Sequence, residues 1–86
     1  MSKILLLEDD LSLINGLSFA FFKQGYELEV ARTVREAEAV WADGRYDLLI
    51  LDVSLPDGSG FEVCKIVRQT SKVPIIFLTA SDEEVS

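Results

Sequence analysis

The chain has 86 residues, of which 49% are hydrophobic, and its 8 basic and 15 acidic side chains give a net charge of −7. This length allows one domain at most, and the acidic balance argues against a nucleic-acid-binding face or an anionic membrane surface, which need basic residues. The charge fits either a site that holds a cation or a solvated acidic surface.

Missing residue types exclude several kinds of chemistry. The sequence has no histidine, so an imidazole base, a histidine metal ligand and a Ser-His or Cys-His nucleophile pair are impossible. Its one cysteine, Cys64, cannot form an internal disulfide, and we expect it to pack in the face of a helix. No secretory signal is recognisable, and no apolar run approaches the about 18 residues of a membrane span. We therefore expect a soluble, cytoplasmic protein.

Four short apolar runs alternate with segments of helical periodicity. The runs predict strands at residues 3–7, 27–31, 47–51 and 74–78. The first, third and fourth are continuously apolar, which is typical of strands buried on both faces, whereas the second alternates like a strand nearer an edge. Three intervening segments predict helices with one apolar face, made by Ile14, Leu17 and Phe21, by Val34, Ala37, Val40 and Trp41, and by Val63, Ile66 and Val67.

Capping signals support these helices. Gly25 and Gly44 are stop signals for the first two. Three capping boxes mark helix starts: Thr33 with Glu36, Ser59 with Glu62, and Ser81 with Glu84. Strands that alternate with helices predict an α/β fold with a parallel sheet, right-handed crossovers and helices on both faces. Ligands of such sheets bind beyond the carboxyl ends of the strands, where the strand order reverses.

The strand ends carry the candidate functional residues. Glu8, Asp9 and Asp10 follow the first strand, Asp52 follows the third, and Thr79 and Ala80 follow the fourth. We interpret Asp10 as the N-cap of the first helix. If the first and third strands are neighbours, the other three carboxylates meet at one spot, and their repulsion favours a hard divalent cation such as Mg²⁺.

A carboxylate beside such a cation can be a nucleophile toward phosphorus. Asp52 would then form an acyl phosphate, with Mg²⁺ neutralising most of the charge on the phosphoryl oxygens. The Thr79 hydroxyl and backbone N–H groups would assist, and the small side chain of Ala80 leaves room for the donor.

Three stretches of the chain, "ILLLEDD", "LLILDVSLPDGSGFEVCKIVR" and "VPIIFLTA", resemble the receiver domains of two-component response regulators, the CheY-like superfamily. These three stretches are most similar to those of regulators that carry a winged-helix DNA-binding domain, the OmpR/PhoB type. The resemblance implies a flavodoxin-like doubly wound sheet of strand order 2-1-3-4. It also implies phosphorylation by a sensor histidine kinase to control an output such as transcription, with no enzymatic turnover.

Residue roles follow from the same resemblance. Asp52 would be the phosphoacceptor, and the metal ligands would be Asp9, Glu8, Asp52 and the carbonyl group of Ser54. Thr79 would be the hydroxyl that moves to bond the phosphoryl group, which the backbone N–H of Ala80 would also bind. The sequence Pro56-Asp57-Gly58 is turn chemistry by itself, so we interpret Asp57 as a turn residue and not a ligand.

The chain departs from the family pattern after the fourth strand, since it ends at Ser86 before the family's fifth strand, last helices and phosphoryl-binding lysine. Lys65 and Lys72 cannot take that lysine's role. We therefore expect residues 1–86 to be an incomplete receiver domain. Residues 74–78 would form an exposed apolar edge and the face of Leu17 and Phe21 would lose cover, so we expect self-association.

Two alternative functions stay open. The chain could be a truncated, self-associating fragment without phosphotransfer competence. A Mg²⁺-dependent phosphatase of the haloacid dehalogenase type is less favoured, because that chemistry wants a second aspartate at position 54, where the sequence has Ser54. A nucleotide-binding fold is disfavoured because no glycine-rich loop follows the first strand.

Overall fold

Strands and helices alternate strictly along the chain. The structure, a computed structural model, describes residues 2–78. In order, its elements are β1 (Lys3–Leu7), α1 (Leu11–Lys23), β2 (Glu27–Ala31), α2 (Val34–Asp43), β3 (Leu48–Asp52), α3 (Gly60–Arg68) and β4 (Ile75–Leu78). The helix expected from Ser81 and Glu84 lies outside the described residues.

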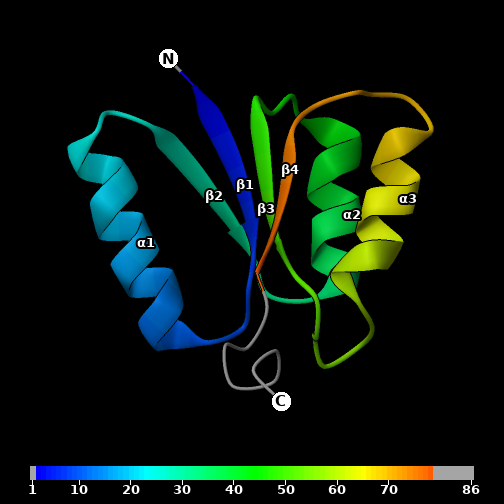
Figure 1. Cartoon of the computed structure of the whole chain (residues 1–86), viewed down its shortest axis with the longest axis horizontal. Helices are drawn as coiled ribbons and strands as arrows, with labels where there is room; N and C mark the ends of the chain where they lie inside the picture. The colour runs from blue at the N-terminus through cyan, green and yellow to red at the C-terminus, as the bar shows by residue number, and fades with distance from the viewer. Residues whose placement is uncertain (1, 79–86) are drawn as a thin grey trace.

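The strands form one parallel sheet in the order β2-β1-β3-β4, which confirms the predicted strand order. Helix α1 lies on one face of the sheet, and α2 and α3 lie on the other (Figure 1). Leu7 pairs with Leu51, so β1 and β3 end side by side. The order reverses between these two strands, and the loops that follow them therefore meet at one edge of the sheet.

Alternation along the strands divides the core into two parts. Leu5 and Leu7 belong to the larger cluster, which α2 and α3 cover, whereas Ile4 and Leu6 belong to a smaller cluster with Ile14 of α1. Cys64 packs against the larger cluster, as expected. The predicted faces of α1 and α2 pack into these clusters, although their outer members are only partly buried. In α3, Val63 and Val67 belong to the larger cluster, whereas Ile66 belongs to neither.

The helix ends agree largely with the sequence signals. Gly25 follows α1 with a φ of 84°, and the N–H groups of Gly25 and Tyr26 close the helix on the carbonyls of Phe22 and Phe21, both at 3.0 Å. At the start of α3, the predicted capping box is confirmed.

The box predicted for α2 is only half formed. The Thr33 hydroxyl accepts from the Glu36 N–H at 3.0 Å, but the Glu36 carboxylate accepts from the N–H of Arg32, at 2.8 Å, and not from that of Thr33. Gly44 ends α2, as expected, although its backbone is extended and not left-handed. Its missing Cβ leaves room for the Tyr46 hydroxyl, which would lie 2.9 Å away from such an atom.

Three strand boundaries differ from the prediction, one of them because β4 begins at Ile75 and not at residue 74. Strand β3 begins at Leu48 and includes Asp52, because Asp52 still pairs with Leu78 of β4. Among the described residues β4 lies at the sheet edge, and Ile76 is 50% exposed, so burial on both faces was wrong for this strand. Within residues 2–78, no helix is both long and apolar enough to cross a membrane.

Candidate functional site

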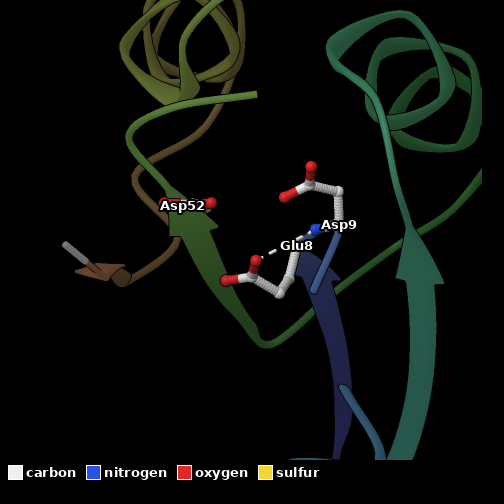
Figure 2. A group of neighbouring side chains, drawn as sticks. All are labelled: Glu8, Asp9 and Asp52. Atoms are coloured by element: carbon white, nitrogen blue, oxygen red, sulfur yellow. Dashed lines mark hydrogen bonds between the residues drawn. The ribbon is translucent and has the colours of Figure 1, made fainter. Parts of the chain in front are cut away.

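Three carboxylates from two neighbouring strands come together at the edge of the sheet. Glu8 and Asp9 follow β1, and Asp52 ends β3; one carboxylate oxygen of each lies within 4.8 Å of the other two (Figure 2). The predicted meeting of these three side chains is therefore confirmed. Parallel pairing is the cause, since it brings the carboxyl ends of β1 and β3 to the same edge.

Glu8 is the buried member of the group, at 4% exposed. Its N–H extends the sheet pairing by donating to the carbonyl of Ala31 at 3.0 Å, which turns the side chain inward. Its Oε2 atom accepts from the N–H groups of Asp9 and Asp10, both at 3.0 Å. Burial raises the pKa of the Glu8 carboxyl, the nearby charge of Asp52 raises it further, and the two backbone N–H groups oppose the shift.

Asp52 is held by the backbone around it. Its Oδ1 atom accepts from the N–H of Ser54 at 3.3 Å, and the next N–H, that of Val53, donates to the carbonyl of Leu78 at 3.1 Å. Gly60, the first residue of α3, lies directly against the Asp52 main chain, where an added Cβ would collide with the carbonyl oxygen. The end of β3 is therefore fixed by β4 on one side and by α3 on the other.

Asp10 is separate from this group, as the sequence predicted. Its Oδ1 atom accepts from the N–H groups of Ser12 at 2.9 Å and Leu13 at 3.2 Å, so it is the N-cap of α1. It fixes where α1 begins and thereby the short loop that carries Asp9.

The loop after β3 makes a tight turn at Leu55–Gly58. Leu55 and Gly58 exchange two backbone hydrogen bonds, of 2.9 and 3.3 Å, and Gly58 has a φ of 155° that favours glycine. Asp57 lies in this turn, as expected, but it also caps α2: its two oxygens accept from the N–H groups of Val34 at 2.8 Å and Arg35 at 3.1 Å. These hydrogen bonds hold the pKa of Asp57 below its usual value.

Arg32 makes a second long-range contact at this site, with the loop that carries Asp9, and no sequence pattern indicated it. Its Nη2 atom donates to the main-chain carbonyl of Asp9 at 3.0 Å. Neither this contact nor the capping role of Asp57 follows from a motif, because each joins residues 23 positions apart. Thr79 and Ala80, the other two predicted site residues, lie outside the described residues.

The donor set suits a hard cation. All the side-chain ligand atoms are carboxylate oxygens, the type that Mg²⁺ binds in one or two copies together with carbonyl oxygens and water. Burial and the nearby charge of Asp52 raise the pKa of Glu8, and the positive charge of such an ion would offset the repulsion between the two carboxylates. The residues present therefore fit Mg²⁺.

Residues 4–86 match the family described as the response regulator receiver domain. The chain belongs to this family. It is 42% identical over 82 residues to the uncharacterized transcriptional regulatory protein YclJ of Bacillus subtilis, an alignment that covers 95% of this chain and 36% of that protein. This receiver domain spans 36–38% of the length of the first curated relatives that it matches, which include a transcriptional regulatory and a sensory transduction protein.

Solved receiver structures share the fold. The response regulator TrrA of Thermotoga maritima, solved in complex with Mg²⁺-BeF, is 37% identical with a TM-score of 0.85, over 93% of this chain and 70% of that one. TrrA in its complex with the histidine kinase ThkA gives a TM-score of 0.83 at the same identity and coverage. The receiver domain therefore has the CheY-like fold that the sequence predicted and belongs to two-component signal transduction.

Proposed function

We propose that this receiver domain works in the cytoplasm and accepts a phosphoryl group on Asp52, in a reaction that depends on Mg²⁺, from a sensor histidine kinase. The observation that carries the proposal is the meeting of Glu8, Asp9 and Asp52 at the ends of adjacent strands, in a chain of the receiver family. The names of the relatives support transcription as the output of the full-length protein. The complex of TrrA with ThkA supports a histidine kinase as the donor.

The residues divide the chemistry among them. A carboxylate oxygen of Asp52 forms a bond to phosphorus, the bond from phosphorus to the donor nitrogen breaks, and its electron pair stays on the donor imidazole, which takes up a proton. Glu8, Asp9, Asp52 and the carbonyl of Ser54 would hold Mg²⁺, which when bound neutralises charge on the phosphoryl oxygens. The Thr79 hydroxyl and the Ala80 N–H would bond those oxygens. The phosphoryl group stays on Asp52, so this step is not enzymatic turnover.

Phosphorylation of the chain by acetyl phosphate with Mg²⁺ tests the proposal. Intact mass spectrometry should find one added phosphoryl group on the wild-type chain and none on Asp52→Asn, which keeps the shape of the side chain and removes the nucleophile. Removal of Mg²⁺ with a chelator should also abolish the adduct. An adduct that survives in Asp52→Asn would refute the role of Asp52, and no adduct on either chain would favour a fragment without phosphotransfer competence.

We also propose that a polypeptide limited to residues 1–86 associates with itself through β4. Ile76 is half exposed at this edge, and an unpaired apolar strand edge is a template for another chain. Sedimentation should show concentration-dependent association that Ile76→Lys weakens, whereas Gln69→Lys, which changes an exposed polar residue at the end of α3, should not. A monomer at high concentration with a cooperative melt would contradict this proposal.

A further inference from the structure

The first turn of α2 contacts both loops that carry the carboxylates. On one side it receives Asp57 from the loop after β3, and on the other Arg32, just before the helix, reaches the loop after β1. Figure 1 shows α2 on the face of the sheet opposite α1. The two contacts link the loops after β1 and β3 through the start of this helix.

The contact through Asp57 uses the whole carboxylate. One oxygen accepts from the N–H of Val34 and the other from that of Arg35, at 2.8 and 3.1 Å. Two charge-assisted hydrogen bonds to adjacent main-chain groups fix both the distance and the orientation of the loop relative to α2. The Leu55–Gly58 bridge closes the turn around Asp57. A shift of α2 would therefore also move this turn and the segment before it, which carries Ser54 and Asp52.

The contact through Arg32 is also anchored at both ends. Its guanidinium donates to the Asp9 carbonyl at 3.0 Å, and its own N–H donates to the Glu36 carboxylate at 2.8 Å. The residue is therefore tied to α2 by its main chain and to the Asp9 loop by its side chain. Asp9 follows Glu8, whose carboxylate in turn accepts from the Asp9 N–H.

We propose that Arg32 and Asp57 are positioning residues that act in series through the first turn of α2 and set the spacing between Asp9 and Asp52 for a divalent cation. The inference rests on the proposed function. Without a cation the three carboxylates repel each other, and the two loops that carry them would move apart unless something held them. Holding the ligands in place before the ion arrives reduces the ordering that binding requires, and so strengthens it.

Isothermal titration with Mg²⁺ tests the two residues, using the 86-residue chain in its wild-type form and as Arg32→Ala, Asp57→Ala and the double variant. We expect each single variant to weaken Mg²⁺ binding on the order of 10-fold, as the loss of contacts behind metal ligands does in other sites. The direction of the change in Mg²⁺ affinity is decisive for Arg32→Ala. Removal of a nearby positive charge would by itself tighten the binding of a cation, whereas loss of positioning weakens it. Tighter or unchanged binding by Arg32→Ala would overturn the inference.

The double variant tests the arrangement in series. Once either contact is broken, the chain of hydrogen bonds from one loop to the other through α2 is interrupted. Breaking the second contact should then add little, and the double variant should bind Mg²⁺ about as weakly as the weaker single variant. Losses that add fully would show two independent effects and overturn the proposal. Two control variants remove exposed charges near the other end of α2. Arg45→Ala removes a positive charge, as Arg32→Ala does, and Asp43→Ala removes a negative charge, as Asp57→Ala does. Both controls should leave Mg²⁺ binding within about twofold of wild type.

A measurement without metal separates positioning from general loss of stability. Hydrogen exchange of the Val34 and Arg35 amides should be faster in Asp57→Ala than in the wild-type chain. Thr33→Ala removes the N-cap hydroxyl of the same helix but leaves both contacts in place, so it should lower stability without the 10-fold loss of Mg²⁺ affinity. An equal loss in Thr33→Ala would show that fraying of α2 is the cause and overturn the inference. A wild-type chain that binds no Mg²⁺ would instead refute the proposed function, and the inference with it.

Discussion

The contact between α3 and the end of β3 predicts that Gly60→Ala destabilises the fold and disturbs the carboxylate site together. Gly60 is buried, and a Cβ atom there would collide with the carbonyl oxygen of Asp52 and lie 3.2 Å from the Cβ of Leu51. The oxygen belongs to the main chain of a strand that pairs on both sides, so it cannot move aside as a flexible side chain could. Either α3 or the end of β3 must shift.

The size of the effect follows from this collision. Overpacking of a well-packed core costs about 1–3 kcal/mol. In a domain of this size each kcal/mol changes the melting temperature by about 4–8 °C, so Gly60→Ala should melt about 5–20 °C lower than the wild-type chain. A shift of the β3 end also moves Asp52 relative to Glu8 and Asp9, and Mg²⁺ affinity should fall with it.

Gly16→Ala is the matched control. Gly16 lies inside α1, and a Cβ atom there would meet nothing within 4 Å. The same substitution should therefore stabilise the chain by about 0.5–1 kcal/mol, because alanine favours a helix interior over glycine. Thermal unfolding followed by circular dichroism measures both variants, and calorimetry gives their Mg²⁺ affinities. Equal melting temperatures for Gly60→Ala and wild type would refute the close packing of α3 on β3, and so would unchanged Mg²⁺ affinity in a clearly destabilised variant.

Two further predictions concern titrating groups. Because the pKa of Glu8 is raised in the folded chain, its ionisation costs stability above that pKa, and the cost disappears as pH falls toward the ordinary value of 4.5. Metal-free Glu8→Gln should therefore have a larger free energy of unfolding in urea than wild type at pH 7.5, with a smaller gap near pH 5; a gap that grows at low pH would contradict this. Burial and the charge of Glu29 raise the pKa of Tyr46 to about 12. Tyr26→Phe leaves Tyr46 as the one tyrosine of the chain, and its ultraviolet titration should have a midpoint near 12. The free energy of unfolding should fall as pH rises from 10 toward 12, because the tyrosine ionises more readily in the unfolded chain. A midpoint near 10 in a folded chain would contradict the buried hydroxyl.

Local patterns were enough to predict which segments are strands and helices, and the resemblance to receiver domains supplied the order of the strands in the sheet. The apolar runs and helical stripes set the element order, and parallel strands place their carboxyl ends at one edge, so Glu8, Asp9 and Asp52 had to lie close together once β1 and β3 were neighbours. The cap of Asp10 was equally predictable, since its partners are two and three residues away.

The contacts that hold the loops were not predictable in the same way. Spacing suggested that Glu36 pairs with Thr33, but its carboxylate bonds Arg32, one residue earlier. Asp57 was interpreted correctly as a turn residue, yet nothing local indicates that it caps a helix that begins 23 residues before it. Such contacts depend on how the loops approach one another in space, which a single sequence does not encode as a period or a motif.

The burial of Glu8 connects stability to binding at this edge of the sheet. Glu8 is 4% exposed beside Asp52, and within residues 2–78 two backbone N–H groups offset the charge of its carboxylate. Burial raises the pKa of Glu8 and the charge of Asp52 raises it further, so a proton and a divalent ion compete for the same oxygens. Mg²⁺ binding should then lower the pKa of Glu8 and release protons, and affinity should weaken as pH falls through the raised pKa. The same carboxylate that destabilises the metal-free fold is therefore the one whose repulsion a cation relieves most, so stability and affinity respond to Glu8→Gln in opposite directions.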